Sequence, residues 1–80
     1  MKHETRLMAK AEGQYPGRFV VLRDLGDGHN PYVTHIWFDG TYAPEGYVWG
    51  NYFDNPADAM QDFVDRLQKE INIQKEMSRV

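Results

Sequence analysis

The carboxylates of Asp39, Glu45 and Asp54 are the side chains of this sequence best suited to act as an acid–base pair. Such a pair needs two carboxyl groups held close together in different environments. All three residues lie in stretches rich in Gly, Pro and Asn, where turns and helix caps use acids without any chemistry. The only serine, Ser78, lies near the C-terminus, and there is no cysteine to act as a nucleophile. We therefore expect a non-enzymatic protein.

Metal and phosphate sites are also poorly supported. The three histidines match no ligand spacing. Asp24 and Asp27 flank a glycine, but the alternate-position pattern and closing Glu of a calcium loop are missing. The segment 26–28 (Gly-Asp-Gly) lacks the further spacing and the lysine of a phosphate-binding loop. The sequence therefore predicts no metal and no cofactor.

Charge and aromatic residues are unevenly distributed along the chain. The 42 residues between Arg23 and Arg66 contain no lysine or arginine, but they hold eight acids and nine of the eleven aromatic residues. Residues 24–65 sum to −8, whereas residues 1–23 sum to +3 and residues 66–80 to +2, which gives the net charge of −3. Acidic and aromatic groups together favour binding to a basic partner.

The composition is that of one small globular domain. With 80 residues, 41% apolar and 26% charged, the chain can fold around a modest core. The absence of cysteine fits a reducing compartment, and no signal peptide or membrane-spanning stretch is apparent. We expect a cytoplasmic protein, located in the host-cell cytoplasm if a phage encodes it.

The clearest predicted element is a helix over residues 55–77. Asn55 suits the N-cap and Pro56 the first helical position. The apolar residues recur at i, i+3, i+4, i+7 and i+11, on one helical face: Met60, Phe63, Val64, Leu67 and Ile71. This face is expected to pack on the sheet.

The acids of this region fit the same helix. Asp54 and Asp58 are expected to support its start, where the helix dipole favours negative charge. Asp62 and Asp65 are expected to lie on a solvated helical face.

Three strands are predicted before the helix. They cover Arg18 to Leu25, Tyr32 to Phe38 and Tyr47 to Phe53, and turn-forming segments separate them. Residues 1–14 are ambiguous, since they fit an N-terminal arm, a strand or a short helix. The predicted fold is α+β: a three-stranded antiparallel meander at 18–53, with room for a fourth N-terminal strand, packed on one long C-terminal α-helix.

The predicted sheet has more aromatic residues than one helix can cover. Regular alternation places Tyr47, Trp49 and Phe53 on one face, with Val48 and Tyr52 on the other. Both faces therefore keep aromatic side chains. The uncovered face is predicted to be covered by the N-terminal segment, to form a homodimer, or to bind a partner.

Direct binding of nucleic acid is not expected, because eight acids and no basic residue lie in the segment 24–65 that supplies most of the sheet. The length, the lack of cysteine, the β-β-β-α order and the acidic-aromatic run from Asp24 to Asp65 resemble small accessory proteins of phages and mobile elements of the anti-CRISPR type. That resemblance implies binding to a Cas effector.

The function predicted from the sequence is a protein-binding inhibitor or adaptor that docks an acidic-aromatic surface on a basic, nucleic-acid-binding protein. The predicted contact residues lie on the two turns and the last strand: Asp24, Asp27, Asp39, Tyr42, Glu45, Tyr47 and Trp49. A homodimeric regulatory module and a toxin–antitoxin component are the alternatives, and both monomer and homodimer remain open.

Overall fold

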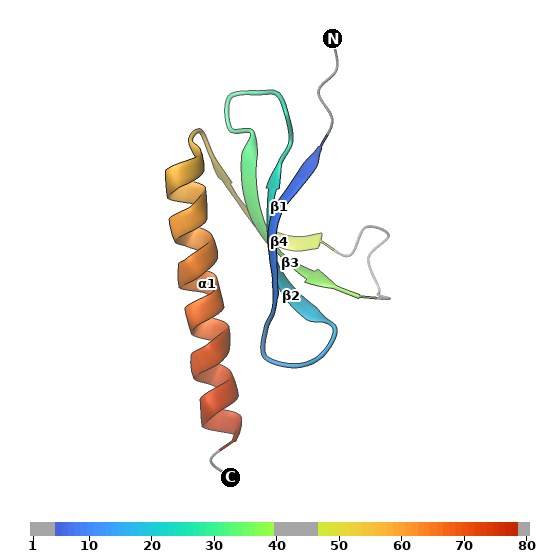
Figure 1. The fold of residues 1–80 in the computed structure, drawn as a ribbon, viewed down its shortest axis with the longest axis vertical. Helices are drawn as coiled ribbons and strands as arrows, with labels where there is room; N and C mark the ends of the chain where they lie inside the picture. Colours follow the sequence, from blue (N-terminus) through green and yellow to red (C-terminus); the bar gives the residue numbers. More distant parts are fainter. Residues whose placement is uncertain (1–4, 40–46, 79–80) are drawn as a thin grey trace.

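The computed structural model describes residues 5–39 and 47–78 of the chain. Its elements, in order, are β1 (Arg6–Glu12), β2 (Arg18–Asp24), β3 (Tyr32–Phe38), β4 (Tyr47–Phe53) and α1 (Pro56–Met77) (Figure 1). The strands form one antiparallel sheet in the order β1-β2-β3-β4, and α1 packs on one face of it. The predicted α+β fold is confirmed, and the ambiguous N-terminal segment forms an edge strand.

The central strands β2 and β3 pair without interruption, from Arg18 opposite Phe38 to Asp24 opposite Tyr32. Their side chains alternate as the sequence predicts. The helix-facing side includes the following residues: Val20, Leu22, Thr34 and Ile36. The opposite side, called here the open face, includes the following residues: Phe19, Val21, Arg23, His35 and Trp37.

Both edge strands contain a β-bulge. In β1 the register shifts between Leu7 and Ala9. In β4 two residues, Trp49 and Gly50, lie opposite the single residue His35. Bulges twist an edge and interrupt its row of unpaired backbone groups, which opposes sheet-to-sheet aggregation.

The β4 bulge changes which face its aromatic residues occupy. Trp49 adopts a positive φ of 54°, which few non-glycine residues do. Tyr47 packs on Trp37 at the open face, whereas the Trp49 ring meets Phe38 edge-on at the helix side. The predicted common face for Tyr47 and Trp49 is therefore wrong, because the extra residue inverts the alternation between them.

The helix begins as predicted. The Asn55 side chain accepts a hydrogen bond from the Asp58 backbone N–H at 2.9 Å, and Pro56 occupies the first turn. With 22 residues α1 is about 33 Å long, whereas a seven-residue strand spans about 23 Å. The C-terminal end of α1 consequently runs past the β1–β2 turn (Figure 1).

A buried carboxylate joins the middle of α1 to the β1–β2 turn. Glu70 is only 5% exposed. Its two oxygens accept hydrogen bonds from Arg18 Nε (2.7 Å) and Nη2 (3.1 Å), and from the backbone N–H (3.1 Å) and Nε2 (2.9 Å) of Gln14. A Cβ at position 13 would collide with Glu70 Oε1, so Gly13 permits this close approach.

A second carboxylate, Asp62, joins α1 to β3 and β4. It accepts hydrogen bonds from Thr34 Oγ1 and, at 3.2 Å each, from Asn51 Nδ2 and Arg66 Nε. Burial would raise the pKa of Asp62, but these hydrogen bonds and the Arg66 charge hold the pKa below its ordinary value. Asp62 is therefore a structural anchor, and the predicted solvated role is wrong for this residue.

These two anchors set the rotation of α1 about its axis. Asp62 and Glu70 both point to the sheet, so the side of α1 between them faces it, with Ala59 fully buried there. The predicted apolar face of the helix is partly rotated away from the sheet, so that Met60 is 53% exposed and Val64 56% exposed. The prediction that this whole face packs on the sheet is wrong, because hydrogen-bonded carboxylates determine the contact side.

We predict that Glu70→Gln lowers the free energy of unfolding by about 3 kcal/mol, since it leaves the mostly buried Arg18 guanidinium without a counter-charge. Urea denaturation at pH 7 measures the change. The matched control is Glu12→Gln, an exposed position on β1, where the expected change is within about 0.5 kcal/mol. Equal stability of the two variants would contradict the anchoring role.

Candidate functional site

The structure separates most of the contact residues predicted from the sequence. Asp27 lies in the β2–β3 turn and Asp39 directly after β3, so the two occupy opposite ends of that strand. Tyr47 and Trp49 lie on opposite faces of the sheet. Tyr42 and Glu45 lie outside the described residues. The predicted set therefore does not form one continuous surface within the part of the chain that the structure describes.

Asp24 has a structural role at the end of β2. It accepts a hydrogen bond from the Gly26 backbone N–H at 2.8 Å, and it forms an ion pair with Arg6 of β1 at 3.4 Å. These contacts hold the start of the β2–β3 turn. Asp27 and Asp39 are exposed.

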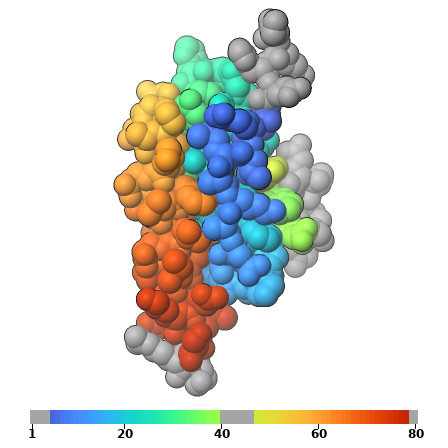
Figure 2. All heavy atoms as spheres, viewed as in Figure 1, coloured from blue at the N-terminus to red at the C-terminus, as the bar shows by residue number. Residues whose placement is uncertain are grey.

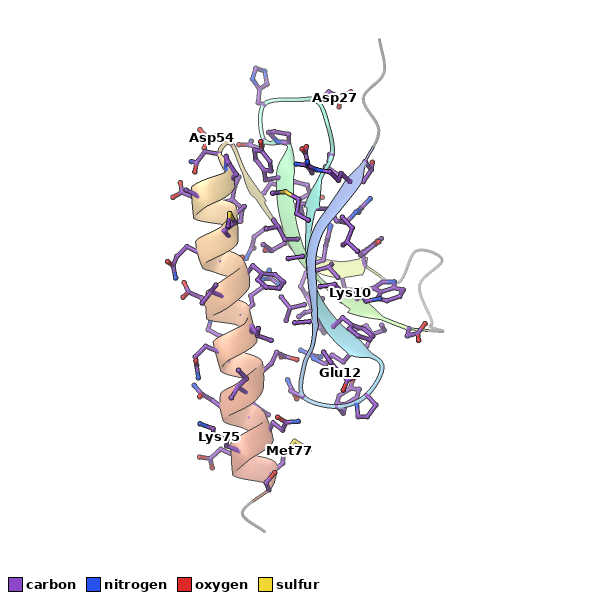
Figure 3. The ribbon with its side chains drawn as sticks, viewed as in Figure 1. Lys10, Glu12, Asp27, Asp54, Lys75 and Met77 are labelled. Atoms are coloured by element: carbon purple, nitrogen blue, oxygen red, sulfur yellow. The ribbon has the colours of Figure 1, made fainter. Side chains whose placement is uncertain are left out.

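The open face of the sheet carries cations on its aromatic rings. Lys10 Nζ lies 4.0 Å from the centroid of Trp37 and 4.4 Å from that of Phe19. The Arg23 guanidinium lies 4.3 Å from the centroid of Tyr47. Figure 3 places Lys10 on the side of the sheet away from α1. The strands thus bring positive charge onto the open face, where it lies over the rings of Phe19, Trp37 and Tyr47.

His35 lies under this cationic layer. It is 7% exposed and packs against Tyr47, with Arg23 Nη1 3.5 Å from its Nε2. Burial, together with the positive charges of Arg23 and Arg66, lowers the pKa of His35 to about 4. The imidazole is consequently neutral at physiological pH.

A groove with a volume of about 270 Å³ lies between α1 and β4. The α1–β4 groove has one aromatic side chain, polar groups and charges of both signs along its walls. Its principal residues are Trp49, Asn51, Asp62, Asp65, Arg66 and Lys69.

An acidic stripe on the helix contributes Asp62 and Asp65 to one wall of the α1–β4 groove. Asp58, Asp62 and Asp65 are spaced i, i+4 and i+7, which places them on one side of α1. Asp54 precedes the same end of the helix (Figure 3). The i, i+4, i+7 spacing of these acids is visible in the sequence. Only the structure shows that this side of the helix borders β4.

The other wall presents Trp49. Its side chain is 64% exposed, although its backbone is constrained. The carbonyl oxygen of Trp49 accepts a hydrogen bond from Arg66 Nη2, and the Arg18 guanidinium lies 5.6 Å from the ring centroid. An exposed tryptophan in a strained, well-supported backbone is unusual, and such strain often marks functional sites.

Most of the positive charge in the α1–β4 groove is internally neutralised. Arg18 pairs with Glu70, and Arg66 pairs with Asp62. Asp58 and Asp65 accept hydrogen bonds from the neutral side chains of Asn55 and Gln61. The groove lining holds three cations and three carboxylates, and Asp58, which precedes it along α1, adds one further negative charge.

We predict that the free energy of unfolding falls by about 2 kcal/mol when the pH is lowered from 7 to 5. The reason is that His35 becomes protonated near pH 6.5 in the unfolded chain but only near pH 4 in the folded chain. The stabilisation is complete above pH 6.5 and decreases as the pH falls towards 4. Urea denaturation of wild type and His35→Gln measures it.

The pH dependence is expected to disappear in His35→Gln and to persist in His29→Gln, whose exposed side chain belongs to the β2–β3 turn. Wild-type stability that is equal at pH 7 and pH 5 would contradict the buried, neutral state of His35.

The described residues contain no group of three or more His, Cys, Asp or Glu side chains placed to hold a metal ion. Within the same ranges, no helix has the length and apolarity needed to cross a membrane. No family model, curated protein or solved structure matches the chain.

Proposed function

We propose that the protein is a non-enzymatic inhibitor or adaptor that docks the α1–β4 groove onto a basic partner protein. The observation that carries this proposal is the position of Trp49, which is exposed, held by Arg66, and in the same groove as the carboxylate of Asp65. Tryptophan is among the commonest energetic anchors of protein interfaces. Neighbouring negative charge accelerates the approach of a basic partner and favours it over acidic ones.

Side-chain docking fits this surface better than strand addition. A peptide that extends the sheet needs a regular row of unpaired backbone groups along the edge strand. The β4 edge is interrupted by its bulge, and the Trp49 carbonyl already accepts a hydrogen bond from Arg66. Lysine or arginine side chains of the partner would instead reach Asp58 and Asp65, while Trp49 packs on their aliphatic stems.

Nucleic-acid-binding proteins are the commonest partners with dense Lys and Arg surfaces. The resemblance to anti-CRISPR proteins places Cas effectors first among the candidates to test. In this proposal the protein binds no nucleic acid itself, and it acts by covering a basic surface of its partner.

We predict that Trp49→Ala and Asp65→Lys each weaken binding tenfold or more, since one removes the anchor and the other inverts the charge beside it. Biolayer interferometry against purified basic proteins, Cas effectors among them, measures the affinities. Binding by wild type is expected to weaken strongly when the salt concentration is raised from about 50 to 200 mM.

Matched controls come from the far end and the opposite side of the molecule. Tyr52→Ala removes another exposed aromatic ring, on the open face of β4, and Asp27→Lys makes the same charge change in the β2–β3 turn. Both controls are expected to bind like wild type. A partner that binds Trp49→Ala and Asp65→Lys with unchanged affinity would refute the α1–β4 groove as the docking surface.

A further inference from the structure

A stripe of apolar side chains runs along α1 on the side opposite its acidic stripe. The apolar stripe consists of Met60, Val64, Leu67 and Ile71. Met60 and Val64 are more than half exposed, and Leu67 and Ile71 are partly exposed. The spacing of 4, 3 and 4 residues is the a/d repeat of helices that pack side by side.

No charged residue interrupts this side of the helix until its last turn. At 100° per residue, Asp58, Asp62, Asp65 and Lys69 fall on the side of α1 that borders β4. The residues that flank the apolar stripe on its solvent side are uncharged: Ala57, Gln61 and Gln68. A helix surface that is exposed, apolar and free of charge is typical of a helix–helix interface.

The sheet of the same chain does not cover this stripe. Asp62 and Glu70 hold a different side of α1 against the strands, and both anchors are fully hydrogen-bonded. Rolling the stripe onto the sheet would break both sets of hydrogen bonds. A surface outside the chain is therefore needed to bury it.

We propose that the apolar stripe of α1 is a homodimer interface, in which the helices of two copies pack antiparallel about a two-fold axis. Such a contact is isologous, so the same stripe must be complementary to itself. With the axis between positions 65 and 66, Met60 lies opposite Ile71 of the second copy. Val64 then lies opposite Leu67 of the second copy, so every residue of the stripe meets an apolar partner.

Charge favours a second copy in the antiparallel orientation. Lys75 lies near the C-terminal end of α1, whereas Asp54 and Asp58 mark its start, at the opposite end (Figure 3). Antiparallel packing brings Lys75 near the acidic helix start of the second copy, and it also opposes the helix dipoles favourably. Parallel packing would instead bring like charges together at both ends.

The length of α1 gives a second copy a long surface to contact. In Figure 2, α1 and β1 lie side by side on one face and the helix extends beyond the sheet, so a second helix has a long surface to contact.

The dimer leaves the proposed docking surface free. The acidic stripe and Trp49 lie on the other side of α1, so each dimer would carry two outward α1–β4 grooves. Dimerisation does not depend on the proposed function, and each can fail without the other.

Sedimentation equilibrium across a concentration range tests the interface directly. Wild type is expected to reach twice the monomer mass of 9.4 kDa, and Val64→Glu to remain at the monomer mass with unchanged helical circular dichroism, because Val64 is exposed in the monomer. Lys69→Glu, a charge change on the α1–β4 groove side, is expected to dimerise like wild type. A wild-type monomer at all concentrations, or a dimer that survives Val64→Glu, would overturn the proposal.

Disulfide cross-linking tests the orientation, since the chain has no cysteine of its own. In the antiparallel dimer, Met60→Cys combined with Ile71→Cys is expected to form cross-linked dimers under mild oxidation. Met60→Cys alone is not, because the two copies of position 60 would lie about 16 Å apart along the helices. Efficient cross-linking of the single variant would overturn the antiparallel arrangement.

Discussion

The buried carboxylate of Glu70 is the interaction on which the rest of this structure depends. The apolar core is small, with six buried hydrophobic residues among those described, and two of these, Val21 and Val33, lie on the open face of the sheet. Glu70 accepts two hydrogen bonds from Gln14 in the β1–β2 turn and two from Arg18 at the start of β2. Burial of its charge is tolerated because Arg18 pairs with it in a bidentate manner. The hydrogen bonds and the charge of Arg18 keep the pKa of Glu70 below its ordinary value, although burial alone would raise it.

Glu70 and Asp62 together give α1 three distinct sides. One side contacts the sheet, a second forms the acidic wall of the α1–β4 groove, and a third leaves Met60 and Val64 exposed. The two proposed interaction surfaces follow from this rotation, since a helix packed by its apolar residues alone would bury the third side. Because polar side chains fix the orientation of the helix, this small domain leaves more of its apolar surface available to partners.

The elements were predictable from the sequence, whereas the arrangement of side chains on them was only partly so. Two of the signals are local: the period-two alternation in β2 and β3, and the helix start at Asn55 and Pro56. The structure confirms both. The bulge at Trp49 depends on pairing with β3 and has no local signal of comparable strength. The pairing of Glu70 with Arg18 joins residues 52 positions apart, which neither charge nor periodicity reveals. Lys10 and Arg23 lie outside the acidic run in the sequence, but strand pairing brings them onto its aromatic residues.

The rotation of α1 is tested most directly by nuclear Overhauser effects (NOEs) between helix and sheet in solution. NOEs are expected from the Ala59 methyl group to apolar side chains of the strands, and none is expected from the Met60 and Val64 methyl groups to any strand of the same chain. Contacts between helices of two copies would not obscure this pattern, because they involve no strand. Strong NOEs from Met60 and Val64 to the sheet would contradict the rotation set by Asp62 and Glu70, and with it both proposed surfaces.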